Sequence, residues 1–212
     1  MKLVDMTIRD FVNEVDSAKP APGGGSSSAV AASIGVGLLR MVGHLTIPKK
    51  KFQKLDKATQ DAFIDNHEAL QSHKRKLLDL VDKDTEAFND IMQAFKMPKE
   101  TDADKKKRQK AIESATLVAI EVPEMMADLA YEALKMVDLV RRYGNKNAVS
   151  DAGVSALLLY AAIEGALLNV KTNIPGLSDP ELAKKYREKA DATLHDARVL
   201  KEEVVNAIHD AL

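Results

Sequence analysis

The segment from Pro20 to Ser28 reads Pro-Ala-Pro-Gly-Gly-Gly-Ser-Ser-Ser and is the most unusual stretch of the chain. Its three glycines allow the backbone to approach a ligand closely, and a helix starting nearby would offer unpaired N–H groups to an anion or a carbonyl oxygen. A flexible connector is the alternative, although a mobile glycine run next to a very apolar stretch would cost entropy. No Gly-Lys-Ser/Thr follows, so the segment is not a nucleotide P-loop. We therefore predict a substrate-binding loop.

Asp84 is the acidic residue best suited to proton transfer. Alternating steps of four and three residues from Leu77 to Phe95 pass through Asp84, which places its carboxylate on the apolar face of a helix, whereas Asp82 lies off that face. A carboxylate among core positions needs a hydrogen-bond partner or a raised pKa, and either condition suits an acid/base group. A structural aspartate bonded to a neighbouring helix end explains the pattern equally well.

A polar loop from Gly144 to Asp151 leads into a second, almost uncharged helical stretch. Asp151 and Asn169 are separated by nearly a whole number of helical turns, so both can project from one side near opposite ends of that helix. Asp151 could instead favour the helix N-terminus electrostatically. Glu164, the lone charge within the helix, is more simply explained as a hydrogen-bonded structural residue.

The composition excludes several function classes. The 31 Lys and Arg nearly balance the 32 Asp and Glu, so no net field favours nucleic acid or an anionic membrane. The absence of cysteine excludes disulfides, thiolate metal sites and cysteine nucleophiles and fits a reducing compartment. The five histidines show no close ligand spacing, so we predict no metal site. Residues 1–5 lack the apolar core of a signal peptide, and we expect a cytoplasmic protein.

The stretch from Ala21 to Leu39 carries no charge and matches a membrane-spanning length. Gly, Ser and Ala dominate it, however, so lipid burial would contribute little free energy. We therefore expect a central helix of a soluble bundle and no membrane partner.

Helix signals must supply the framework for these residues, because only 4 % of the chain is aromatic and alternating β-branched runs are missing. Residues 29–42 and 152–170 are too apolar to face water on any side, so the remaining helices should wrap them. No internal repeat, low-complexity tail or linker divides the chain. The sequence thus predicts an all-α fold, a single-domain bundle of long helices around two apolar central helices, over residues 1–212.

Capping and breaking residues predict where the helices begin and end. For the helix starts we expect capping pairs at Thr7 with Asp10 and at Thr101 with Asp104, and serine caps at Ser26–Ser28, Ser150 and Ser178. For the helix ends we expect stops at Met97-Pro98 and Gly144-Asn145. We also expect a break near Asp65-Asn66, in a long helical region that Pro48 opens, and a kink or break at Pro123.

Taken together, these motifs resemble the cyclodeaminase/cyclohydrolase family, which includes the C-terminal domain of formiminotransferase-cyclodeaminase and stand-alone methenyltetrahydrofolate cyclohydrolases. The resemblance covers nearly the whole chain. It rests on the following segments in order: Pro20 to Ser26, Met41-Val42-Gly43 with Leu45-Thr46, Leu80 to Asp84 with Ala87-Phe88, Gly144-Asn145, Ser150-Asp151 and Asn169-Val170. Where bifunctional relatives have Tyr-Gly-Arg-Arg after Leu-Thr, this chain has Ile47-Pro48-Lys49-Lys50, which keeps the basic character but not the tyrosine.

The resemblance implies an all-helical homodimer with a folate site that needs no metal, nucleotide or other prosthetic group. It matches Asp84 to the family's catalytic aspartate, and we take Asp151 as a second catalytic candidate. The residues expected to bind the folate substrate are Pro22, Gly23, Gly24, Gly25, Ser26, Asn145 and Asn169. A homodimer also fits the amount of apolar helix face, which exceeds what one small bundle is expected to cover.

Three functions are consistent with these residues and with the resemblance. The first is a formiminotetrahydrofolate cyclodeaminase, which would convert 5-formiminotetrahydrofolate to 5,10-methenyltetrahydrofolate and ammonia by carboxylate acid/base catalysis. The second is a methenyltetrahydrofolate cyclohydrolase, which would open the same methenyl bridge to 10-formyltetrahydrofolate. The third is a helical scaffold without activity.

Overall fold

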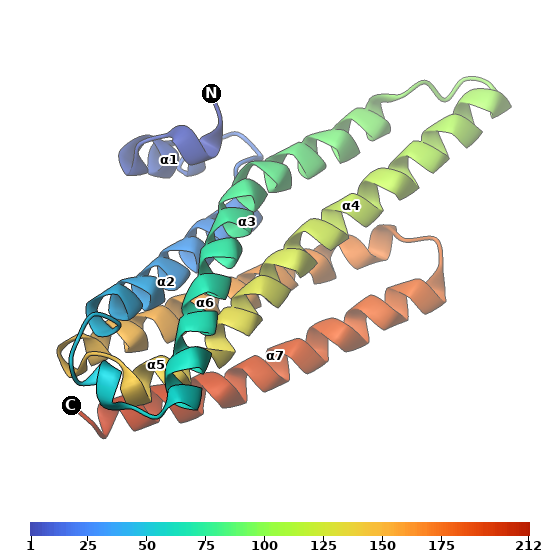
Figure 1. Cartoon of the computed structure of the whole chain (residues 1–212). Coiled ribbons are helices and arrows are strands. Elements are labelled where there is room, and N and C mark those ends of the chain that lie inside the picture. Colours follow the sequence, from blue (N-terminus) through green and yellow to red (C-terminus); the bar gives the residue numbers. More distant parts are fainter.

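The computed structural model describes all residues from 1 to 212, and every regular element in it is helical (Figure 1). This confirms the predicted all-α bundle. The seven α-helices are α1 (Ile8–Val15), α2 (Gly24–Thr46), α3 (Lys57–Lys96), α4 (Asp102–Lys135), α5 (Val137–Tyr143), α6 (Val149–Asn173) and α7 (Pro180–His209). Short 3₁₀ turns lie at η1 (Leu3–Asp5), η2 (Phe52–Lys54), η3 (Lys146–Ala148) and η4 (Ile174–Gly176).

The apolar helices α2 and α6 form the centre of the bundle and pack against each other in antiparallel orientation. Gly24 lies beside Asn169 at one end of the pair, and Ser155 Oγ donates a 2.6 Å hydrogen bond to the Gly35 carbonyl further along. Small residues permit this close approach, since a Cβ added at Gly165 would lie 2.5 Å from Ser28 Oγ. Helix α3 packs on α2, and helices α4 and α7 pack on α6. The short helix α1 lies at the edge of the bundle, beside α2 and α3 (Figure 1).

Several predicted helix ends are confirmed because short-range hydrogen bonds determine them. Thr7 caps α1, and Thr101 forms a complete capping box with Asp104 at the start of α4. Met97 follows the last residue of α3, and Gly144 follows the last residue of α5, as the two stop signals predict.

The serine caps are wrong. Helix α2 begins at Gly24 after Gly23, so Ser26 to Ser28 lie inside its first turns, and Asp179 rather than Ser178 caps α7. Ser150 lies within the first turn of α6, which begins at Val149 without a side-chain cap. In α2 the serine hydroxyls are used for hydrogen bonds to backbone carbonyls or to α3, so they are not free to cap.

Two predicted breaks are also wrong. Helix α3 begins at Lys57, where Asp56 caps it, and continues for 40 residues through Asp65-Asn66. Helix α4 continues through Pro123, and the chain instead changes direction at Met136. Packing of both long helices against the centre of the bundle outweighs the local preference of these residues.

The two central helices are covered on all sides but one, which corrects the prediction that neither could face water. Ile34, Met41 and Leu45 of α2 are exposed, and so are Val154, Leu157 and Leu168 of α6, the last with 61 % of its surface accessible. By length and composition alone, Gly24–Thr46 and Lys146–Gly176 could cross a membrane, and half of the most apolar stretch of each is buried inside the bundle. Buried core helices of soluble proteins share these properties.

Candidate active site

Asp84 faces the N-terminus of α2 and is bonded to Ser26. The Ser26 backbone N–H donates to Asp84 Oδ2 at 2.8 Å, and the Ser26 hydroxyl lies 3.1 Å from the same oxygen. The hydroxyl also lies 2.8 Å from the Val81 carbonyl, to which it can donate while its oxygen accepts a hydrogen bond from a protonated Asp84. Both protonation states of the carboxyl group are therefore satisfied.

Gly25 is the residue that allows this close approach. A Cβ built at Gly25 would lie 1.9 Å from Asp84 Oδ1 and 2.4 Å from Asp84 Cγ, far inside any real contact. Because Gly25 has an ordinary helical backbone rather than a positive φ, the requirement comes from space and not from backbone freedom. The carboxyl group lies directly against the first turn of α2.

The environment of Asp84 changes its acidity. Burial raises the pKa of the Asp84 carboxyl above its ordinary value of 3.8, and the two hydrogen bonds from Ser26 act in the opposite direction but do not cancel the effect. A carboxyl group with a raised pKa can both accept and return a proton nearer to neutral pH than an exposed aspartate can.

The backbone at the start of α2 offers further donors. The N–H groups of Gly24 and Gly25 make no hydrogen bond within the chain, because no helical residue precedes them by four positions. They carry the positive end of the helix dipole and can bind a carbonyl oxygen or an anionic group of a substrate.

These groups line a cavity of about 260 Å³. Its other walls come from α6, through Asn169 and Asn173, and from α3, through Phe88 and Ile91. Asn169 Nδ2 donates to the Gly165 carbonyl at 2.8 Å, which fixes the side chain beside Gly24. The volume lies just below the roughly 300–1,000 Å³ of typical small-molecule sites, so the cavity encloses the reacting part of a larger ligand rather than the whole of it.

The structure brings together Asp84, Gly23, Gly24, Gly25 and Asn169 out of the residues predicted for the site. Ser26 is fully buried and acts on the site through Asp84. Pro22 is buried behind the loop and does not line the cavity, whereas Pro20 and Ala21 do.

Thr172 and Asn173 were missed by the sequence reasoning. The signal was available for Asn173, because it lies one turn after Asn169 on the same face of α6. Phe88 and Ile91 belong to the apolar stripe between Leu77 and Phe95, whose periodicity predicts core positions. In the structure both are only half-buried and form part of the cavity wall.

Asn145 and Asp151 lie at the other end of the bundle. The Asn145 backbone N–H donates to Thr46 Oγ1 at the last residue of α2, about 33 Å along the helix from Gly24 at 1.5 Å per residue. Asp151 is half-buried in the first turn of α6, about 27 Å from Asn169 on the same scale. Within one chain neither residue reaches the Asp84 cavity, so a role for either in that cavity would require a partner subunit.

Comparison with known proteins provides independent findings. The family model described as formiminotransferase-cyclodeaminase matches residues 7–192. The methenyltetrahydrofolate cyclohydrolase of Methylorubrum extorquens is 34 % identical over 202 residues, which cover 95 % of each chain. The formimidoyltransferase-cyclodeaminase of Gallus gallus is 32 % identical over 196 residues, which are 92 % of this chain but only 36 % of that protein. The crystal structure of formiminotetrahydrofolate cyclodeaminase from Thermotoga maritima superposes with a TM-score of 0.71 at 27 % identity and covers 100 % of this chain and 98 % of that one.

Proposed function

The chain belongs to the formiminotransferase-cyclodeaminase family, and we propose that it is a formiminotetrahydrofolate cyclodeaminase. The proposed reaction converts 5-formiminotetrahydrofolate to 5,10-methenyltetrahydrofolate and ammonia. The observation that carries the proposal is the Asp84 carboxyl group, which has a raised pKa and lines a cavity beside free N–H donors. The full-length match to the cyclodeaminase of Thermotoga maritima supports it.

The chemistry requires one proton to move between two nitrogens of the substrate. In the protonated formimino group, N10 attacks the formimino carbon and forms a tetrahedral centre. Asp84 takes the proton from N10 and gives it to the exocyclic amino group, which then leaves as ammonia with the electrons of its carbon–nitrogen bond. The positive charge of the substrate remains on the methenyl bridge, so atoms and charge balance without a further reactant.

The residues around Asp84 have separate roles in this scheme. Ser26 holds the carboxyl group in place in both protonation states, and Gly25 leaves room for it. The N–H groups of Gly24 and Gly25 and the side chain of Asn169 are positioned to orient the polar part of the ring system, while Phe88 and Ile91 contribute an apolar wall. The carboxylate also stabilises the cationic carbon electrostatically.

Methenyltetrahydrofolate cyclohydrolase is the second candidate, and one observation favours it. The match to the cyclohydrolase of Methylorubrum extorquens covers 95 % of both proteins. The match to the formimidoyltransferase-cyclodeaminase of Gallus gallus covers only 36 % of that protein. In the cyclohydrolase reaction water adds to the methenyl carbon while Asp84 takes one of its protons. Asp84 then returns this proton to N5 as the carbon–N5 bond breaks, and the remaining hydroxyl proton is released to solvent as the formyl C=O of 10-formyltetrahydrofolate forms. The same residues serve both reactions because both pass through a tetrahedral carbon.

Supplying each folate separately distinguishes the two functions. Ammonia release together with the appearance of methenyl absorbance from 5-formiminotetrahydrofolate supports the cyclodeaminase. Loss of methenyl absorbance faster than the spontaneous rate supports the cyclohydrolase. A purified, folded protein that does neither would overturn the assignment of enzymatic activity to this cavity.

We also propose that the protein acts as a homodimer through the exposed face of α2 and α6. On α2 the exposed and half-buried apolar positions include Ala31, Ile34, Leu38, Met41 and Leu45, and on α6 the exposed apolar positions are Val154, Leu157, Ala161 and Leu168. Both sets follow steps of three and four residues, so each lies along one side of its own helix, and the other helices of the chain leave these sides exposed. Exposed apolar faces on two neighbouring helices are typical of a subunit interface.

A further inference from the structure

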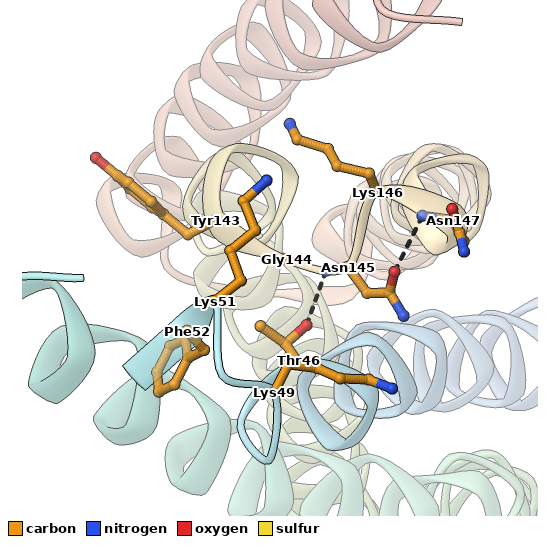
Figure 2. Close-up of a pocket in the computed structure, with 9 residues that line it drawn as sticks. All are labelled: Thr46, Lys49, Lys51, Phe52, Tyr143, Gly144, Asn145, Lys146 and Asn147. Carbon is orange, nitrogen blue, oxygen red and sulfur yellow. Dashed lines mark hydrogen bonds between the residues drawn. The ribbon is translucent and has the colours of Figure 1, made fainter. Parts of the chain in front are cut away.

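Figure 2 shows the residues around a second cavity, of about 290 Å³. This cavity lies at the C-terminal end of α2, whereas Asp84 lies at the N-terminal end of the same helix. It is lined by Lys49 and Lys51, from the loop after α2, and by Lys146, from the loop after α5. No Asp or Glu lines this cavity. We propose that it is a separate binding site for a compact anion that carries two or more carboxylate or phosphate charges.

The three lysines are free to bind such a ligand. None of Lys49, Lys51 and Lys146 takes part in an ion pair, and none of their ammonium groups makes a hydrogen bond. The nearby arginines Arg141 and Arg142, by contrast, are paired with Asp138. In a chain with a formal net charge of −1, this cluster is a local concentration of positive charge that the rest of the molecule does not neutralise.

The loop that carries Lys146 is fixed in place. Thr46 Oγ1 accepts a 2.9 Å hydrogen bond from the Asn145 N–H, and Asn145 Oδ1 accepts one of 3.1 Å from the Asn147 N–H (Figure 2). Gly144 allows the loop to pass close to α5 and α2, since an added Cβ would lie 2.3 Å from the Val140 carbonyl. A fixed loop lowers the entropy lost when a ligand binds.

The remaining lining groups suit an oxyanion. Asn145 Oδ1 accepts the bond from the Asn147 N–H, and its Nδ2 group makes no hydrogen bond within the chain and remains a donor. Phe52 is a buried apolar part of the lining and packs on Phe63. Lysines bind anions as point charges from several directions, which fits several adjacent charged oxygens better than a single planar carboxylate. We therefore expect the site to bind anions according to the number of negative charges they carry rather than according to their shape.

Titration calorimetry with citrate and with inorganic phosphate, as separate probes, tests this inference. We expect saturable binding of at least one probe that weakens as salt is added. Lys49→Gln and Lys146→Gln should each weaken binding about two- to fivefold, the range for loss of one exposed charge partner, and the double variant should weaken it further. Tighter binding of citrate would identify polycarboxylates as the ligand class, and tighter binding of phosphate would identify phosphates.

Two controls keep this result separate from the catalytic proposal. Lys106→Gln removes one exposed lysine on α4 and should leave binding unchanged. Asp84→Asn should also leave it unchanged, because the two cavities lie at opposite ends of α2. Failure of the wild-type protein to bind either probe, or an equal loss in the Lys106→Gln variant, would overturn the anion site without affecting the assignment of Asp84.

Discussion

Replacing Gly25 with alanine should lower turnover strongly while leaving the fold intact. The added Cβ would lie 1.9 Å from Asp84 Oδ1, whereas ordinary contact begins near 3.4 Å, so the carboxyl group must retreat by about 1.5 Å. A retreat of that size breaks the 2.8 Å hydrogen bond from the Ser26 N–H. Misplacement of a catalytic group by about 1 Å can cost on the order of a hundredfold in rate, and we expect at least that loss in kcat.

The stability of the Gly25→Ala variant should change much less than its rate. Crowding costs about 1–3 kcal/mol, but alanine in a helix recovers up to about 1 kcal/mol relative to glycine, and Asp84 can turn towards the open cavity. Two glycines of the same helix provide matched controls. At Gly24 the added Cβ would be 3.4 Å from Asn169 Nδ2, an ordinary contact, and at Gly37 it would meet nothing within 4 Å.

Steady-state rates and thermal melts of the three alanine variants decide the question. We expect a large loss of kcat for Gly25→Ala, a modest effect for Gly24→Ala and none for Gly37→Ala. If Gly25→Ala retains wild-type turnover while its melt is unchanged, the position of Asp84 against α2 is not needed for catalysis.

Three other changes test separate parts of the account. Ser26→Ala removes the hydroxyl but keeps the backbone N–H bond to Asp84. The kcat should fall about five- to tenfold, which corresponds to the loss of about one hydrogen bond, and KM should change little. An unchanged kcat would contradict the positioning role of Ser26. The pKa of Asp84 is raised in the folded state, so the folded protein loses stability as the pH rises above 3.8 and through the folded-state pKa. Urea titrations should therefore show Asp84→Asn to be more stable, relative to wild type, at pH 7 than at pH 4. An equal difference at both pH values would contradict the raised pKa. Leu157→Glu, on the apolar face of α6, should give a monomer by light scattering, whereas Val199→Glu on α7 should leave the dimer intact. A wild-type protein that is monomeric at micromolar concentration would refute the proposed dimer.

The fold could be predicted from the sequence because its determinants are local. The caps at Thr7 and Thr101 and the stop at Gly144 depend on residues within one turn, and the low aromatic content leaves no material for a sheet. The break expected at Asp65-Asn66 failed because burial of Phe63 and Leu70 on either side keeps α3 continuous. Local propensity is weak compared with tertiary packing.

The candidate site was predictable in part. The apolar stripe identified Asp84 as unusual, but its contact with Gly25 joins positions 59 residues apart, and no local pattern encodes it. The same limit applies to Asn145 and Asp151, which lie in sequence motifs of the family yet far from Asp84 in space. Periodicity assigns a residue to a face of a helix, and only packing decides which faces meet.

Asp82 shows why the choice of control depends on the structure. The sequence places it off the apolar stripe, where a substitution should do little. In the structure, however, Asp82 Oδ1 accepts a 2.6 Å hydrogen bond from the Leu3 N–H and so holds the N-terminal segment against α3. Asp79 is exposed on the same helix and makes no such bond, which makes it the better control.

The most direct test of the account is the turnover of Asp84→Asn beside that of Asp79→Asn, each measured with both folate substrates. The amide is nearly isosteric with the carboxyl group and can still accept the Ser26 N–H bond, but it cannot accept and return a proton near neutral pH. We predict a loss of about a hundredfold to ten-thousandfold in kcat for Asp84→Asn with an intact melt, and a near wild-type rate for Asp79→Asn. Small and equal effects at the two positions would contradict the assignment of Asp84 as the proton-transfer residue.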